Sequence, residues 1–397
     1  MSWSETTLGP HVDLISGPAF KSRNFTDDPS DVPLVKGENI GQGIILWEKS
    51  KYWPRADSEG YERFSLQPSD VILAMDRPWV SAGLKYAVIN ERDHKALLVQ
   101  RVARMRGENG LSSQYLRYII ASPAFCAYAK NIMGGTNVPH ISGDQIRAFP
   151  FSLPPKSDQH RISSFLSAYD DLIENNRRRI QLLEQAARLL YKEWFVHLRF
   201  PGHEHLTITD GVPEGWEKMK LTEIADIRMG QSPKSIYYNG DGNGLPFHQG
   251  VTNFGVRFPS HQTYCTVQNR LAEPGDILFS VRAPVGRINI TINRIVIGRG
   301  LAAIRSKLDQ QNLLFYALKS HFFKEDLIGS GAIFAAITKK DLHGVELIQA
   351  SDRIPEMFME HVRPIDLQIE NLHQTIDNLT QARDLLLPRL MNGEVAV

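Results

Sequence analysis

The sequence lacks the features that would place it in a membrane or in an oxidising compartment. It contains only two cysteines, Cys126 and Cys265, without C-x-x-C spacing, which is typical of a reducing compartment and argues against a zinc site or a disulfide framework. It has no apolar run of about 18 residues. Its first residues have neither the basic nor the apolar stretch of a signal peptide. We therefore expect a cytoplasmic protein with no membrane partner.

The sequence also lacks a large net charge and recognisable catalytic motifs. The 45 Lys and Arg residues balance 44 Asp and Glu residues, which leaves a net charge of +1, so any binding of nucleic acid must use local patches or partners. No P-loop G-x-x-x-x-G-K-[ST] is present. The one Pro-Pro pair, in LPPK, lacks the polar and aromatic neighbours of the adenine methyltransferase motif D/N-P-P-Y/F. We predict a chain that is not an enzyme and has no catalytic, cofactor-binding or metal-binding residue.

Three short segments only imitate ligand sites. NGDGNG, which begins at Asn239, is similar to the start of an EF-hand loop, but its twelfth position is Gly250 rather than glutamate, so a turn is expected. The HEH segment at 203–205 could hold a metal ion, although two histidines in a linker are more often solvated. The basic run at 177–179 could contact phosphate, but its place on the outer face of a helix favours a partner-subunit or solvent contact.

What the sequence does contain is a second copy of itself. The offset between matching segments falls from 213 to 196 residues along the chain and never rises, as expected for two copies of one module that differ by loop deletions. We infer an internal duplication. The matching pairs are 3–22 with 216–235, 68–78 with 274–284, 118–125 with 316–323, 135–146 with 331–342, and 173–190 with 369–386.

Each copy predicts the same order of elements. Short runs rich in Val, Ile and Phe, such as DVILAM and GDILFSV, are bounded by Gly, Pro, Asp and Asn and predict strands. A shorter helix is expected near 113–130 and near 311–327. A long helix ends each copy, with Ser157 as the candidate N-cap of the first. The predicted fold class is α+β, with two mixed α/β modules, each followed by a long helix.

Both long helices carry apolar residues at alternating three- and four-residue steps, which predicts a coiled-coil seam of about four heptads. A helix of about 35 residues spans roughly 50 Å, longer than a small domain is wide. We expect the two helices to pair as an antiparallel coiled coil about a pseudo-two-fold axis; the alternative is that each folds back on its own module. The seam residues are Ile173, Asn176, Ile180, Leu183 and Leu190 in the first helix and Ile369, Leu372, Ile376, Leu379 and Leu386 in the second.

Two similar modules on a rigid spacer suit a periodic target, and successive turns of a DNA duplex lie roughly 34 Å apart. Polar loops in both modules carry the side chains that contact phosphates and base edges, although solvated turns have a similar composition. The candidates are Lys21, Arg23, Lys36, Asn39, Arg77, Arg101 and Arg104 in the first module and Gln231, Ser232, Lys234, Tyr237, Tyr238, Gln249, Asn253, Arg282 and Arg299 in the second.

Three segments are similar to the specificity subunits of type I restriction-modification systems. GWEKMKLTEIADIRMGQSP opens the second module, and DQIRAFPFSLPPKSDQHRI, which leads into the first long helix, resembles the central conserved region of that family. IENLHQTIDNLTQARDLLLPRLMNGEV resembles its distal conserved region. The resemblance covers the whole chain in the right order. One departure is that the PEGW lead-in at Trp216 has no counterpart at Trp3.

The resemblance implies that each module is a target-recognition domain for one half of a bipartite, asymmetric site in double-stranded DNA. The long helices would set the gap between the halves and dock two methyltransferase subunits. Restriction subunits with translocase and nuclease activity can then join this complex. S-adenosylmethionine, ATP and Mg would then belong to those partner subunits. A duplicated protein-binding scaffold on a coiled coil is the alternative. The predicted domains are 1–155 and 205–350 for target recognition, 156–200 for the central helix and 351–393 for the distal helix.

Overall fold

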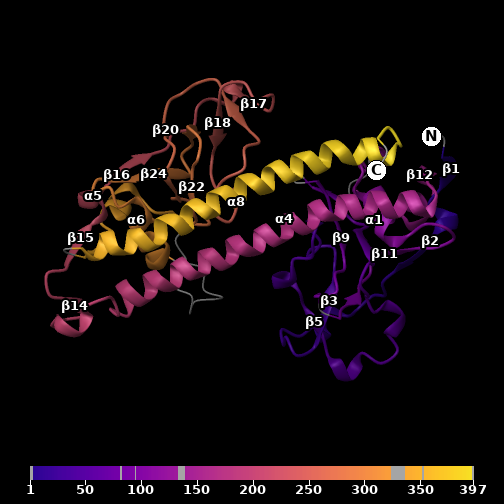
Figure 1. The fold of residues 1–397 in the computed structure, drawn as a ribbon, viewed down its shortest axis with the longest axis horizontal. Helices are drawn as coiled ribbons and strands as arrows, with labels where there is room; N and C mark the ends of the chain where they lie inside the picture. The colour runs from indigo at the N-terminus through magenta and orange to yellow at the C-terminus, as the bar shows by residue number, and fades with distance from the viewer. Residues whose placement is uncertain are drawn as a thin grey trace. The chain divides into compact units, whose positions relative to one another are not determined.

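The computed structural model describes residues 3–80, 83–93, 95–132, 139–322, 336–350 and 353–395. The chain divides into two compact units, Met1–Asn176 with Gln374–Val397, and Arg177–His373. Each unit holds one β-rich module and parts of two long helices, α4 (Lys156–Tyr191) and α8 (Ile354–Met391), each drawn as a continuous helix in Figure 1. None of the helices in these ranges is long and apolar enough to cross a membrane.

The central sheet of the first unit has five strands in the order β2-β11-β6-β9-β4. The inner strands β6 and β11 are buried over most of their length because one face packs on α1 and the other on a small second sheet. Burial on both faces explains why these strands are apolar runs rather than alternating ones. The elements are β2 (Val12–Ser16), β4 (Gln42–Gly43), β6 (Val71–Ala74), β9 (Tyr86–Val88), β11 (Val102–Gly107) and α1 (Ser113–Ala121).

Smaller elements complete the first unit. In the second sheet, β10 pairs parallel with β3, and β5 pairs antiparallel with β3. β1 and β12 form an antiparallel ribbon that joins the two ends of the module. The elements are β1 (Ser4–Thr7), β3 (Val32–Val35), β5 (Tyr52–Trp53), β7 (Trp79–Val80), β8 (Gly83–Leu84), β10 (Leu97–Leu98), β12 (Pro150–Leu153), α2 (Pro123–Ile132), α3 (Gly143–Arg147) and the 3-10 turns Gly9–His11, Ser22–Asn24, Trp47–Lys49, Arg55–Asp57 and Glu62–Phe64.

The second unit has the same plan. Its central sheet has the order β16-β24-β21-β22, and a second sheet has the order β17-β19-β18-β23-β20. The strands are β13 (Ile208–Thr209), β14 (Val212–Pro213), β15 (Glu217–Lys220), β16 (Ala225–Met229), β17 (Tyr238–Asn239), β18 (Leu245–His248), β19 (Tyr264–Cys265), β20 (Leu271–Ala272), β21 (Ile277–Ser280), β22 (Ile288–Ile290), β23 (Ile295–Ile297), β24 (Leu301–Ser306) and β25 (Glu346–Gln349). The helices are α5 (Leu221–Ile224), α6 (Gln311–Phe322), α7 (Lys339–His343), the π-helical turn Lys192–Val196 and the 3-10 turns His203–His205 and Ser235–Tyr237.

The internal duplication inferred from the sequence is visible in the strand registers. A residue and its pairing partner in the first unit have counterparts that pair in the second. Both short helices α3 and α7 also begin with a capping box, at Ser142 and Thr338. Residues 133–138 and 323–335, which include parts of two matching segments, lie outside the described residues. Equivalent pairs are Ser16–Ala103 with Met229–Ala302, Val71–Val88 with Ile277–Ile290, Leu34–Leu97 with Phe247–Val296, and Ser4–Leu153 with Glu217–Gln349.

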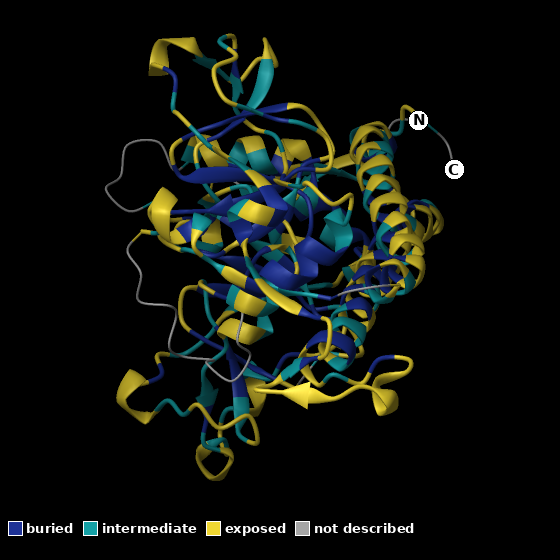
Figure 2. Cartoon of the chain, turned by 90° about the vertical axis from the view of Figure 1, so that its left-hand side faces the viewer, coloured by how far each residue is buried: buried dark blue, intermediate teal, exposed yellow. Residues whose placement is uncertain are grey.

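In each unit one helix contributes its first part and the other its last part to the core. In the first unit Leu166 of α4 and Leu387 of α8 belong to one buried cluster. In the second, Trp194 and Phe358 belong to another. In Figure 2 the central strands are dark blue, whereas the long helices are largely yellow and teal. The expectation that Ser157 caps α4 is wrong, because the helix begins one residue earlier and Pro155 O accepts the first amide bonds.

Candidate nucleic-acid interface

Three loops of the second unit meet beside the ends of β16, β18 and β24. Gly230 N donates to Leu301 O at 2.9 Å, which ties the loop after β16 to the start of β24. Gly300 N donates to Gln249 O at 3.1 Å and so joins the loop after β18. Side chains close the cluster, since Ser232 Oγ donates to Gln249 Oε1 at 2.7 Å. We call residues 230–238, 249–250 and 298–300 the second loop cluster.

The first unit builds an equivalent cluster from residues 17–25, 36–38 and 99–101, here called the first loop cluster. Gly17 N donates to Val102 O at 3.3 Å and Gln100 N donates to Pro18 O at 2.9 Å. The glycine that opens each cluster is required by close packing. A Cβ at Gly17 would lie 2.3 Å from the backbone oxygen of Leu98, and a Cβ at Gly230 would lie 2.2 Å from that of Gly298. The two modules therefore present the same backbone frame at the same place.

The side chains on these frames differ. The second loop cluster exposes Lys234, Gln249 and Arg299. In the first loop cluster Lys21 is exposed, and Lys36 pairs with Glu38 and lies 5.2 Å from the centre of the Phe25 ring. Exposed cations and amides beside aromatic rings are suited to phosphates and base edges. The same backbone frame therefore carries different side chains in the two modules.

Both modules of the chain match a known protein family. The family model for the type I restriction modification DNA specificity domain matches residues 2–185, which include the first module and most of α4, and residues 213–348, which lie in the second module and end before α8. The chain belongs to this family. The resemblance deduced from the sequence is confirmed, and DNA recognition is favoured over the protein-binding scaffold.

Individual members of this specificity family match along most of the chain. The putative type I restriction enzyme MjaX specificity subunit of Methanocaldococcus jannaschii is 29% identical over 383 residues, which is 93% of this chain and 88% of the relative. The HindI specificity subunit of Haemophilus influenzae is 22% identical over 473 residues and covers 99% of each chain. The crystal structure of a type I restriction-modification system S subunit from M. genitalium covers 98% of this chain and 96% of its own, with a TM-score of 0.57 at 16% identity, which shows likeness of fold alone.

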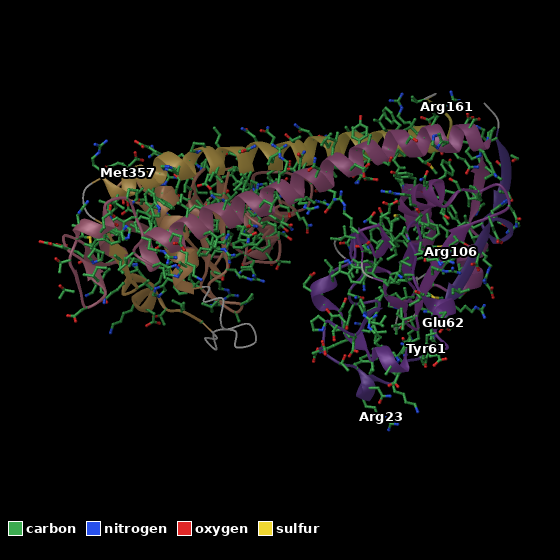
Figure 3. The ribbon with its side chains drawn as sticks, turned by 60° about the horizontal axis from the view of Figure 1, so that its bottom comes forward. Arg23, Tyr61, Glu62, Arg106, Arg161 and Met357 are labelled. Carbon is green, nitrogen blue, oxygen red and sulfur yellow. The ribbon has the colours of Figure 1, made fainter. Side chains whose placement is uncertain are left out.

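The structure places ten of the sixteen DNA-contact candidates in the two loop clusters and an eleventh, Arg101, at the edge of the first. The residues in the second loop cluster are Gln231, Ser232, Lys234, Tyr237, Tyr238, Gln249 and Arg299, and those in the first are Lys21, Arg23 and Lys36. Arg23 lies at the end of its module remote from the α4 residue Arg161 (Figure 3). Tyr238 is a support rather than a contact, because its hydroxyl donates to Pro233 O at 2.8 Å and its ring stacks on Phe247 at 4.5 Å.

Other candidates lie elsewhere. Arg77 is exposed in the loop after β6. Arg101 lies at the edge of the first loop cluster, where its exposed side chain donates to Asp76 at 2.6 Å. Burial would raise the pKa of Asp76, but hydrogen bonds from His140 and Arg101 outweigh it and lower that pKa. Arg282 is exposed beyond β21, and Asn253 is half-buried in the turn after β18.

Two candidates point into the module rather than outward. Asn39 is 0% exposed; its Nδ2 donates to Leu34 O and Ser50 Oγ, and its Oδ1 accepts from Lys36 N. Arg104 is 3% exposed and donates to Asp13 at 2.5 Å. Both side chains are committed to partners within the chain and lie under the surface.

None of the ten seam residues is exposed. Four are partly buried, namely Leu183, Leu190, Leu379 and Leu386, and the other six, Ile173, Asn176, Ile180, Ile369, Leu372 and Ile376, are buried. This burial agrees with the helical period that predicted them. Among the described residues no group of three or more His, Cys, Asp or Glu side chains could hold a metal ion.

Two features near the loop clusters were not predicted from the sequence. Gln100 holds the place of Arg299 in the first loop cluster, which only the strand registers reveal. His248, 2% exposed, lies 2.9 Å from His261 through their ring nitrogens, and His261 reaches Asn293 at 2.8 Å. Burial, with a smaller contribution from His261, lowers the pKa of His248 to about 4. A buried neutral histidine in a β-strand has no signal in sequence spacing.

Proposed function

We propose that this chain is the DNA-sequence specificity subunit of a type I restriction-modification complex and that each module recognises one half of a bipartite site in double-stranded DNA. The supporting observation is the pair of loop clusters, which share a backbone frame and differ in side chains. A frame held constant fixes how each module docks. Different side chains on that frame would recognise different base pairs.

In this proposal, residues 1–155 and 205–350 are the two target-recognition domains, and 156–200 and 351–393 are the spacer helices. The helices pair as an antiparallel coiled coil, which is supported by the buried seam residues and by the ion pair between Arg383 of α8 and Asp170 of α4 at 2.7 Å. A spacer of this kind would fix the gap between the two halves of the DNA site.

The spacer also offers a docking surface for a methyltransferase subunit. Leu182, Leu189 and Val196 follow one another at heptad spacing along and just beyond α4. These residues are 58%, 47% and 49% exposed, respectively. Exposed apolar stripes of this kind mark interfaces between proteins. We propose two such subunits per chain, with restriction subunits added to them. S-adenosylmethionine, ATP and Mg would be bound by those partners.

The docking surface can be tested by co-purification of this chain with the methyltransferase subunit. Leu182→Lys combined with Leu189→Lys should reduce recovery of the complex at least tenfold, because two charges would be buried at the interface. Leu308→Lys, at a loop leucine that is 44% exposed in the second module, is the matched control and should not change recovery. Equal recovery with all three chains would contradict the docking surface.

The function is tested by sequencing DNA methylated in cells that express the complex. We expect methylation within one bipartite sequence, and DNA binding that weakens steeply as the salt concentration rises, because phosphate contacts release counterions. An assembled complex that methylates no sequence-defined position would contradict the proposal. A duplicated protein-binding scaffold would instead show no salt-dependent DNA binding.

A further inference from the structure

The second loop cluster holds one side chain in a fixed pose that suits base recognition. Arg299 N donates to Ser232 Oγ at 3.1 Å, so the hydroxyl of Ser232 is left to donate, and it does so to Gln249 Oε1 at 2.7 Å. This chain of bonds orients the amide of Gln249. Its Nε2 carries two donors that have no partner among the described residues, and the side chain is exposed.

Two glycines make room for this pose. A Cβ at position 298 would lie 2.7 Å from Gln249 Oε1 and 2.9 Å from its Cα, and a Cβ at position 300 would lie 2.4 Å from Gln249 O. None of these three distances is compatible with a side chain at position 298 or 300 while Gln249 stays where it is. The first loop cluster has Val99 and Arg101 at these two places. The Gly-Arg-Gly sequence of the second unit therefore serves the placement of Gln249.

The side chains around Gln249 suggest two kinds of DNA contact, namely contacts to phosphates and contacts to base edges. Arg299 and Lys234 are exposed in the same cluster and have no ion-pair partner among the described residues, so they are suited to phosphates, which carry no sequence information. Gln249, in the same cluster, is neutral and has both donor and acceptor capacity. An oriented glutamine amide matches the N6 donor and N7 acceptor that adenine presents in the major groove.

We propose that Gln249 recognises an adenine in the half-site bound by the second module, with Nε2 donating to N7 and the remaining lone pair of Oε1 accepting from N6. Ser232 is a positioning residue that holds the amide. The inference rests on the proposed function and adds a base and a residue to it. The first loop cluster has Lys36 at this place, paired with Glu38, so the other half-site is recognised differently.

The test uses the complex with its methyltransferase subunit and sequencing of methylated sites. With Gln249→Ala, discrimination at one A·T pair in one half-site should fall about 10- to 100-fold, while all other positions stay unchanged. Gln249→Glu should shift that position toward cytosine, whose N4 group is a donor, because a carboxylate only accepts. Ser232→Ala should relax the same pair by a smaller factor and no other pair.

Lys307→Ala is the matched control, because Lys307 follows Ser306 at the far end of β24 from the cluster and donates to Thr222 O. It should leave both half-sites unchanged. If a Gln249 variant methylates nothing, competition between duplexes that carry each base pair at that position gives the preference directly. Unchanged preference for A·T in Gln249→Ala would overturn the inference and leave the proposed function intact. Absence of sequence-defined methylation by the wild-type complex would overturn both.

Discussion

The two units attach their modules to the long helices through ionic clusters that share a frame and differ in the source of the arginine. In the first unit Asp170 of α4 accepts from Tyr118 of α1 at 2.8 Å. In the second, Asp366 of α8 accepts from Tyr316 of α6 at 2.7 Å. These two aspartates, and the two tyrosines, are counterparts in the duplication. The Asp–Tyr pair is therefore common to both clusters.

The arginines come from different places. Asp170 pairs with Arg117 of α1 and with Arg383 of α8, so the first cluster joins the two helices to each other and to the module. Asp366 pairs with Arg257, which lies in the turn after β18 and also donates to Glu184 of α4 at 2.8 Å. The corresponding turn of the first unit has Gly43 at this place.

The two units thus keep the same Asp–Tyr hydrogen bond but use different arginines to join the module to the long helices. Burial would lower the pKa of Arg257, but its interactions with Tyr316, Glu184 and Asp366 outweigh burial and raise that pKa, so the guanidinium remains charged. The Arg257 side chain is 3% exposed, whereas that of Arg383 is 26% exposed. The second cluster thus has one buried cation that joins Glu184 and Asp366, with Lys319 also paired to Glu184 at 3.0 Å, whereas both cations of the first cluster are partly exposed.

The largest expected effect is from Arg257→Met. The change leaves the carboxylates of Glu184 and Asp366 in the interior without this cation, which costs about 3–5 kcal/mol. Hydrogen exchange measured peptide by peptide should show the loss within 177–373. Arg270→Met, at an exposed arginine of the same module, should cost less than about 0.5 kcal/mol. Equal exchange in the two variants would mean that the cluster does not fasten the module.

The second effect depends on pH and concerns His248, whose counterpart in the first unit is Val35. The folded-state pKa of His248 is lowered from 6.5 to about 4, so the unfolded chain takes up a proton first as the pH falls. The contribution of His248 to the free energy of unfolding is fully present above pH 6.5. It falls by about 3 kcal/mol in total as the pH decreases toward 4. Above pH 7 this histidine should have no effect on the pH dependence of stability.

His248→Val should remove that decrease and make the second unit resemble the first. Urea denaturation of wild type and variant at pH 7 and pH 4 gives the comparison. His205→Val is the control, because the His205 side chain is 82% exposed and its loss should leave the acid sensitivity in place. A variant that keeps the full wild-type decrease would show that other groups cause it.

A smaller effect is expected from Arg383→Met in the first cluster. Asp170 keeps Arg117 and Tyr118, so the change removes one charge-assisted hydrogen bond to this partly buried carboxylate, worth about 1.5–3 kcal/mol. Arg383 also pairs with Asp384, but that side chain is 57% exposed, and an ion pair at the surface contributes little. Combining it with Arg117→Met should cost more than the sum of the single changes, because Asp170 then loses both cations. Additive costs in hydrogen exchange of 1–176 would argue that the two arginines act separately.

The parts of this structure that follow a period were predictable from the sequence. The duplication appears as a falling offset, and the seam from Ile173 to Leu386 as a heptad pattern, so both could be found without coordinates. The order of strands and helices in each module follows from the same matches.

The parts that depend on which way a polar side chain points were not predictable. Asn39 and Arg104 are of residue types that often contact DNA at a surface, yet both are buried and bonded to partners within the chain. Arg257 stands in GVRFP, a segment that differs little from the polar loops around it, and only folding brings Glu184 and Asp366 to it. Hydrogen bonds between residues far apart in sequence leave no local pattern.

The smallest expected difference concerns a pair that the duplication has kept unchanged. Arg106 donates to Asp70 at 2.5 Å, and Arg305 donates to Asp276 at 2.5 Å, at the same place in both central sheets. Each aspartate is buried and also accepts from a backbone amide three residues earlier, Gln67 N or Glu273 N. The hydrogen bond to Asp70 raises the pKa of Arg106 against the effect of burial.

Arg106→Gln and Arg305→Gln should therefore have nearly equal costs, each about 1–3 kcal/mol, because each leaves one buried carboxylate with its amide donor and a weaker side-chain partner. Hydrogen exchange in the respective central sheets measures both in the same way. Costs that agree within about 0.5 kcal/mol would mean that the duplicated frame sets the energy of the pair. A larger gap would mean that the surroundings, which differ between the modules, decide it.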